Sequence, residues 1–130
     1  MIQNRLTPFN SAAILIDFQK HLLSTVGSID VKTLIENTFV LGRKLKSLGI
    51  RTILTTAGTK SFGGTFLPQL QMIFPNGRPI ECNTMSVWKD RRVFNYLRRS
   101  RRQTLVVAGL WTDFCVALSA VQALESGYEV

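Results

Sequence analysis

Short apolar runs of the kind found in buried parallel strands recur along the chain. Such strands are apolar on both faces because helices cover the sheet on each side. The clearest runs are 12–17, 51–56 and 104–108, and a weaker run covers 79–82. The segment 57–64 is rich in Gly, Ser and Thr and is predicted to be a loop after the second strand.

Apolar residues recur at helical spacing between these runs. The longest such segment lies between Asp30, a predicted N-cap, and Gly49, a residue that commonly ends helices. Further helices are predicted at 66–74, 89–99 and 114–126. Strands that alternate with helices predict right-handed βαβ units and therefore an α/β fold with a parallel sheet. Ligand sites in such sheets lie beyond the carboxyl ends of the strands.

Length and composition predict a single domain that covers residues 1–130. The chain is 45% hydrophobic, which suffices for one core. Two cysteines, Cys82 and Cys115, are too few for a disulfide framework, and their spacing does not match that of a zinc site. The first residues lack the apolar region of a signal peptide, and no apolar run approaches the ~18 residues of a membrane span. We therefore expect a cytoplasmic protein with no membrane partner.

The net charge of +8 is concentrated in one segment. Six arginines lie within twelve residues: Arg91, Arg92, Arg98, Arg99, Arg101 and Arg102. Such a cluster suits phosphates or anionic lipid. Val93, Phe94 and Leu97 keep an apolar stripe between the arginines, which favours a solvated helix face. Nucleic acid is therefore not an expected partner.

The strongest chemical signal is Cys115, which stands at the start of the last predicted helix, directly after the strand 104–108. A helix N-terminus lowers the pKa of a thiol, and its free N–H groups can stabilise an oxyanion. Asp17 ends the first strand and is expected at the same edge of the sheet. The alternative is that Cys115 is a small buried apolar residue and that Asp17 only caps the next element.

The last three residues, 128–130, follow a helix-ending glycine and look like the start of another strand. The sheet is therefore expected to be incomplete at the C-terminus, with a strand edge and an apolar face left uncovered. We expect the chain to self-associate as a homo-oligomer.

A family resemblance rests on several of these pieces together. They are Ile14-Leu-Ile-Asp-Phe-Gln19, Thr55-Thr56, Trp88 and Ala108-Gly-Leu-Trp-Thr-Asp-Phe-Cys-Val116. With them the chain resembles the isochorismatase-like cysteine hydrolases, and the YcaC-like branch in particular. The resemblance implies a three-layer α/β/α Rossmann-like sandwich with a mostly parallel sheet, shortened here at the C-terminus.

The resemblance also implies roles for individual residues. Cys115 would be the nucleophile and Asp17 the base, and backbone N–H groups near Phe114 and Cys115 would form the oxyanion hole. The peptide between Trp111 and Thr112 would be a candidate for a cis bond. The implied reaction is hydrolysis of a small amide or related carbonyl compound through a Cys thioester, with no cofactor.

One position departs from the family pattern. The resemblance implies a lysine or arginine several residues before Trp88, at the place of Glu81. A glutamate there would raise the pKa of both Asp17 and the thiol. Arg78 and Lys60 are the nearest basic residues in the neighbouring loops. The second hypothesis is therefore a catalytically impaired homologue that acts as an oligomeric or binding protein.

Other residues are candidates for the pocket rather than for the chemistry. Gln19, Phe62 and Trp88 are expected to lie near it, although Trp88 and Trp111 suit an interface equally well. Cys82 is expected to be structural. No metal site is predicted, because His21 is the only histidine of the chain.

Overall fold

The computed structural model describes residues 5–130. Within this range four parallel strands form one sheet in the order β3-β2-β1-β4. The strands are β1 (Ser11–Ile16), β2 (Arg51–Thr56), β3 (Ile80–Glu81) and β4 (Thr104–Gly109). The three longer strands match the predicted runs closely, and β3 is shorter than its predicted run.

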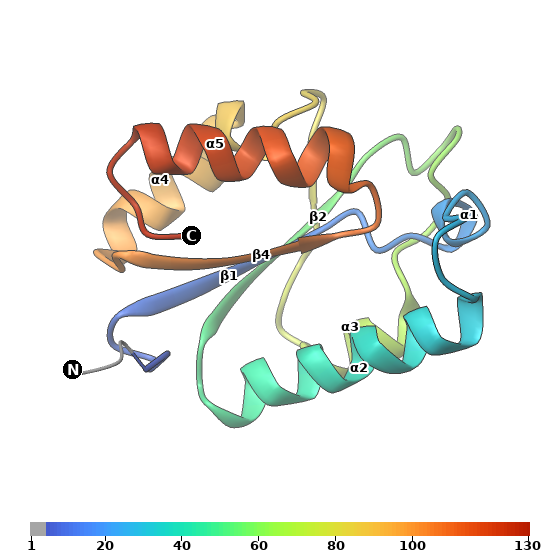
Figure 1. The fold of residues 1–130 in the computed structure, drawn as a ribbon, viewed down its shortest axis with the longest axis horizontal. Helices are drawn as coiled ribbons and strands as arrows, with labels where there is room; N and C mark the ends of the chain where they lie inside the picture. Colours follow the sequence, from blue (N-terminus) through green and yellow to red (C-terminus); the bar gives the residue numbers. More distant parts are fainter. Residues whose placement is uncertain (1–4) are drawn as a thin grey trace.

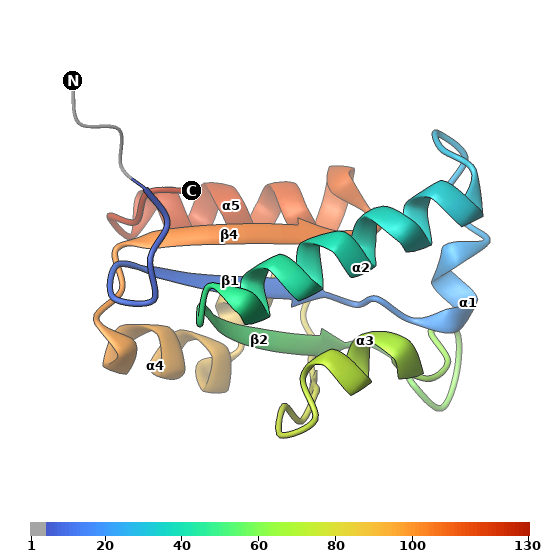
Figure 2. The ribbon, with the colours of Figure 1, turned by 90° about the horizontal axis from the view of Figure 1, so that it is seen from below.

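Helices cover both faces of the sheet, so the fold is an α/β/α sandwich, as predicted (Figures 1 and 2). The helix α2 (Val31–Ser47) and the shorter α3 (Pro68–Ile73) cover one face. On the other face lie α4 (Arg91–Ser100) and α5 (Ala117–Glu125). A short helix, α1 (Lys20–Leu23), follows β1.

Alternate residues of β1 enter two separate cores, one on each face. Ala12, Ile14 and Ile16 pack with residues of α4 and α5, among them Val93 and Leu97. Ala13 and Leu15 pack with residues of α2 and α3, among them Leu45 and Leu70. Every residue of β1 is buried, which is why its sequence after Ser11 is a continuous apolar run.

The predicted helix boundaries are partly confirmed. The carboxylate of Asp30 accepts hydrogen bonds from the Thr33 backbone N–H at 2.9 Å and from Thr33 Oγ1 at 2.7 Å, so it caps α2 as predicted. The helix predicted at 89–99 begins two residues later, since Asp90 is the residue that caps α4. A 3₁₀ turn over Val87–Lys89 precedes it. The last helix begins with a π-helical turn, Thr112–Val116, before α5.

The strand register brings the candidate residues to one edge of the sheet. Ile16 lies opposite Thr55 of β2 and Gly109 of β4, and Thr56 lies opposite Glu81 of β3. The carboxyl ends of all four strands are therefore nearly level.

Beyond β4 the chain pairs once more before it reaches Val130. Thr104 and Glu129 form a parallel bridge, and the Leu105 N–H donates to the Glu129 carbonyl at 2.8 Å. Residues 128–130 thus lie alongside β4 as the start of a strand would, as expected from the sequence.

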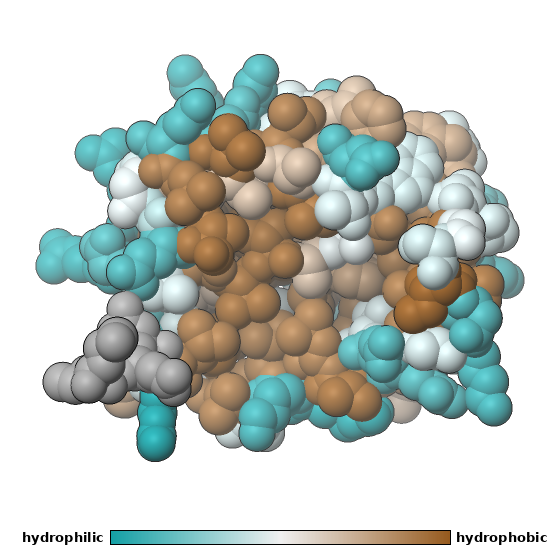
Figure 3. All heavy atoms as spheres, in the orientation of Figure 1, coloured by the Kyte–Doolittle hydropathy of each residue, from teal (hydrophilic) through white to brown (hydrophobic). Residues whose placement is uncertain are grey.

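An apolar face lies over β4 and α5. Leu118, Val121 and Leu124 of α5 are exposed, and most of β4 is only half-buried. Figure 3 shows hydrophobic residues running across this side of the molecule. Among residues 5–130, no helix combines the length and the apolar character that a membrane crossing requires.

Candidate functional site

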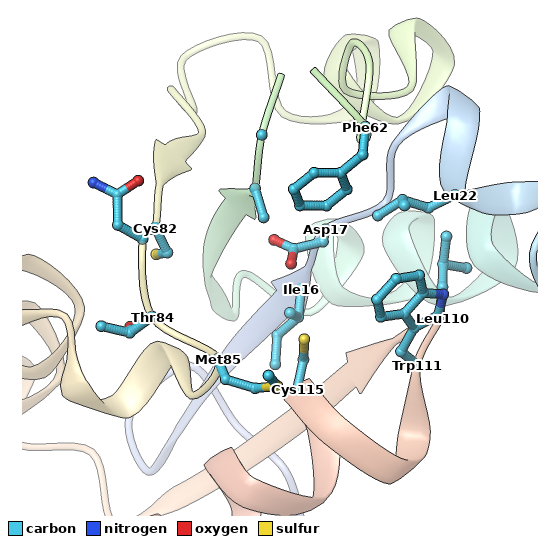
Figure 4. Close-up of a pocket in the computed structure, with 13 residues that line it drawn as sticks. Ile16, Asp17, Leu22, Phe62, Cys82, Thr84, Met85, Leu110, Trp111 and Cys115 are labelled. Carbon is cyan, nitrogen blue, oxygen red and sulfur yellow. The ribbon is translucent and has the colours of Figure 1, made fainter. Parts of the chain in front are cut away.

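A cavity of about 350 Å³ lies at the carboxyl edge of the sheet (Figure 4). Segments from every strand end and from two loops contribute to its wall. The lining residues are Ile16, Asp17, Leu22, Ala57, Gly58, Phe62, Cys82, Asn83, Thr84, Met85, Leu110, Trp111 and Cys115. The two residues predicted to carry the chemistry, Asp17 and Cys115, are both among them.

Asp17 is held by the strand it follows and by its neighbour. Its φ of 55° lies in the left-handed region, which is uncommon outside glycine and turns the chain sharply after β1. Its carboxylate accepts a hydrogen bond from Thr55 Oγ1 at 2.8 Å, and its N–H donates to the Thr55 carbonyl at 3.1 Å. The side chain then points into the cavity (Figure 4).

Burial governs the protonation of Asp17, which is only 8% exposed. Loss of solvation raises the pKa of this carboxyl, and the negative charge of Glu81 adds to the rise, while the hydrogen bond from Thr55 opposes it. A carboxyl with a raised pKa holds a proton more readily than an exposed one does. This is the property required of a group that takes up a proton and returns it.

Cys115 projects into the same cavity from the π-helical turn (Figure 4). It is half-buried. Burial raises the pKa of its thiol, and the nearby charge of Asp17 raises it further. The prediction that the helix start lowers the pKa of Cys115 is therefore wrong, because desolvation and the carboxylate outweigh the backbone contribution. A thiol with a raised pKa gives up its proton less readily, so attack by its sulfur requires a base.

The turn before Cys115 also differs from expectation. Residues 5–130 contain no cis peptide bond, so the bond between Trp111 and Thr112 is trans. The trans form is the lower in energy by about 3 kcal/mol for a non-proline residue, and the π-helical turn accommodates it. Phe114 is half-exposed, and its ring packs edge to face against that of Trp111, with 6.4 Å between the ring centroids.

Glu81 turns away from the cavity toward the loop 57–64. Its carboxylate accepts hydrogen bonds from the Thr59 N–H at 2.9 Å and from Thr59 Oγ1 at 2.6 Å, and these lower its pKa. The expected rise in the pKa of Asp17 is present, but the rise at Cys115 comes from burial and from Asp17. Neither Lys60 nor Arg78 is among the lining residues.

Two of the predicted pocket residues lie outside the cavity wall. Gln19 is fully buried and binds the loop backbone: its Oε1 accepts from the Ala57 N–H at 2.8 Å, and its Nε2 donates to the carbonyls of Ala57 at 3.0 Å and Gly64 at 2.7 Å. Trp88 packs edge to face against Phe94 and Tyr128. Both predictions are corrected: Gln19 fastens the loop, and Trp88 belongs to the core.

Phe62 and Trp111 do line the cavity, as the sequence suggested. Sequence reasoning missed most of the remaining wall, namely Leu22, Asn83, Thr84, Met85 and Leu110. Cys82 was expected to be structural, and it too lines the cavity. Burial raises the pKa of its thiol to about 12, with Asp90 and Asp17 adding to the rise, so it is a far weaker nucleophile than an exposed thiol. The one feature of the sequence that could have indicated these wall residues is that the segments carrying most of them follow the ends of predicted strands.

No group of three or more His, Cys, Asp or Glu side chains within residues 5–130 is arranged to hold a metal ion. His21 lies against Gly64 of the loop, where an added Cβ would come within 2.7 Å of the imidazole. The loop backbone therefore packs closely on this ring.

Comparison with known proteins identifies the family. The model of the Isochorismatase domain matches residues 11–130. The chain is 32% identical to the probable hydrolase YcaC of Escherichia coli, over 97% of this chain and 61% of that protein. The crystal structure of the E. coli YcaC product, described as an octameric hydrolase of unknown specificity, superposes with a TM-score of 0.91 at 29% identity and covers 98% of this chain and 63% of that one.

A second solved structure is equally similar. YcaC from Pseudomonas aeruginosa, described with hexane-2,5-diol and covalent acrylamide, gives a TM-score of 0.91 at 27% identity. The match covers 98% of this chain and 64% of the other, so this chain spans less than two thirds of the length of these relatives. The chain belongs to the isochorismatase-like superfamily, in its YcaC-like branch.

Proposed function

We propose that this protein is a cysteine hydrolase that cleaves a small amide or related carbonyl compound through a thioester on Cys115. The observation that carries the proposal is the shared cavity, into which both the Cys115 thiol and the Asp17 carboxylate project. Burial raises the pKa of the Asp17 carboxyl, so this group takes up a proton more readily than an exposed carboxyl does. Burial and the charge of Asp17 raise the pKa of the Cys115 thiol, so its sulfur needs such a base in order to attack.

The chemistry proceeds in two halves. Asp17 takes the proton of the Cys115 thiol while the sulfur attacks the carbonyl carbon, and backbone N–H groups near Phe114 and Cys115 stabilise the oxyanion. The C–N bond then breaks, and the amine leaves with the proton held by Asp17. Water, deprotonated by Asp17, attacks the thioester, and the acid departs as the thiol is restored.

One relative supports the presence of a reactive nucleophile in this family, since acrylamide bonds covalently to nucleophiles through its carbon–carbon double bond. The P. aeruginosa protein is described with covalently bound acrylamide, a small neutral amide. A site of the same fold, with a cysteine and an aspartate in one cavity, suits capture of a related molecule here.

A second function is favoured by one specific observation. None of the described residues that line the cavity is basic, although the family resemblance implies a lysine or arginine beside the thiol. Without that cation the thiolate is less stable, so an impaired homologue that binds small molecules without turnover is the alternative.

Release of ammonia from a panel of short primary amides separates the two functions. We expect turnover by the unaltered protein and loss of at least about a hundredfold in Cys115→Ser and in Asp17→Asn, a range typical of a lost general base. Met72→Ala is the control and should retain activity, because Met72 is an exposed residue of α3 and lies outside the cavity wall. Absence of both ammonia release and an acyl adduct on Cys115 by mass spectrometry would refute hydrolysis.

We also propose that the protein assembles as a homo-oligomer. The E. coli relative is described as octameric, and an exposed apolar face over α5 and β4 provides a surface for association.

A further inference from the structure

Much of the cavity wall is apolar, and no positively charged side chain is among its described lining residues. Leu22 and Leu110 line one side of it, and Met85 lies opposite Phe62 (Figure 4). Asn83 and Thr84 are the neutral polar side chains of the wall. The ionisable side chains among its described lining residues are Asp17, Cys82 and Cys115, and none of these carries a positive charge.

This composition of the wall disfavours the binding of negatively charged ligands in the cavity. Asp17 already places a carboxylate in a poorly solvated position, where charges interact more strongly than in water. A second carboxylate bound next to it would meet repulsion and would find no cation among the described residues of the wall. An uncharged ligand meets no such repulsion and gains from contact with the apolar wall.

Two aromatic side chains of the cavity wall, Phe62 and Trp111, contact neighbouring parts of the chain. The ring of Phe62 lies over Gly58, where an added Cβ would come within 2.5 Å of its Cε1 atom. Gln19 fastens both ends of the loop that carries this ring. Across the cavity, Nε1 of Trp111 donates a hydrogen bond to Thr25 Oγ1 at 2.7 Å. In Figure 4 the ring of Phe62 is drawn above Asp17, and that of Trp111 is drawn below it and to the right.

We propose that the cavity selects uncharged substrates with an apolar body, that Asp17 excludes carboxylates, and that Phe62 contacts the apolar part. This inference rests on the proposed function for the identity of the reacting groups. It adds the substrate class: neutral amides of small aliphatic or aromatic acids, as opposed to amides or esters that carry a free carboxylate. Asp17 thereby has a role in specificity as well as in proton transfer.

Alkylation of Cys115 tests the proposal without requiring turnover. Iodoacetamide and iodoacetate are nearly the same size and differ by one negative charge; in each reaction the thiolate sulfur bonds to the methylene carbon and iodide leaves. The rate ratio, iodoacetamide over iodoacetate, is measured at Cys115 by peptide mass spectrometry at pH 8. The same ratio in the urea-unfolded chain is the reference.

We expect the ratio to be at least about tenfold higher in the folded protein than in the unfolded chain, which corresponds to about 1.4 kcal/mol of discrimination. In Asp17→Asn the ratio should fall back toward the reference. A folded-state ratio equal to or below the reference, or a ratio unchanged in Asp17→Asn, would overturn the charge selection.

The apolar contact is tested with N-benzyl iodoacetamide. This reagent should outpace iodoacetamide at Cys115 in the unaltered protein, and Phe62→Ala should abolish the advantage. The matched control is Phe9→Ala, since Phe9 is 82% exposed and lies outside the cavity wall. An advantage that survives Phe62→Ala would overturn the role of Phe62. A protein that discriminates in this way but neither releases ammonia nor forms an acyl adduct on Cys115 would refute hydrolysis and leave the selectivity intact.

Discussion

Replacement of Gln19 by alanine provides the most direct test of how the site is supported. Gln19 is fully buried, and its amide makes three hydrogen bonds to the backbone of Ala57 and Gly64. The change leaves one N–H and two carbonyl groups of the loop without this partner. Gln19 lies outside the cavity wall, so we expect the substitution to affect mainly the stability of the protein and only indirectly the shape of the cavity.

The size of the effect follows from the hydrogen bonds. Each contributes about 1 kcal/mol net, and buried groups left without partners cost about 1–3 kcal/mol more where water cannot reach them. We therefore expect Gln19→Ala to lower the free energy of unfolding by about 3 kcal/mol, a large share of the ~5–15 kcal/mol of a typical domain.

Urea unfolding followed by circular dichroism measures this difference through the transition midpoint. Gln69→Ala is the matched control, because Gln69 is an exposed residue of α3; it should change the free energy by no more than about 0.5 kcal/mol. A loss below about 0.5 kcal/mol for Gln19→Ala would show that the loop does not depend on this side chain.

Two further predictions concern charge and association. Asp17→Asn should raise the free energy of unfolding at pH 8, because the folded-state pKa of Asp17 lies above its unfolded value and ionisation therefore costs more in the folded protein. This gain should shrink as the pH falls through the folded-state pKa; an equal gain at pH 8 and pH 4 in urea unfolding would contradict the linkage. Val121→Lys combined with Leu124→Lys, on the exposed face of α5, should weaken self-association in sedimentation experiments, whereas Met72→Lys, at an exposed methionine of α3, should not. A protein that remains a monomer before any substitution would refute the association proposal.

Local patterns explain which parts of the fold the sequence predicts well. The residues of β1 are apolar on both faces because each face enters a core, and this requires no knowledge of the neighbours. Asp30 and Gly49 mark the ends of α2 through capping and left-handed geometry, which are properties of a few adjacent residues. Asp17 and Cys115 meet because parallel strands collect their carboxyl ends at one edge.

Features that depend on distant contacts escaped prediction. Gln19 finds its partners 38 and 45 positions along the chain, so its role as a fastening for the loop has no local signature. The pKa of Cys115 responds to burial and to Asp17, and both outweigh the helix start that the sequence displays. Cys82 enters the cavity wall because β3 pairs with β2, and the short strand gives little indication of that pairing.

The left-handed backbone of Asp17 determines how mutagenesis at this position should be interpreted. Aspartate and asparagine tolerate this conformation better than most side chains, whereas an alanine there is strained by about 1 kcal/mol or more. An alanine scan would therefore combine the loss of a carboxylate with distortion of the chain that leads into α1. Selection experiments at this codon should recover asparagine and glycine among well-folded inactive proteins, and alanine rarely. The residue at position 17 must therefore both supply a carboxylate to the cavity and adopt a left-handed backbone conformation.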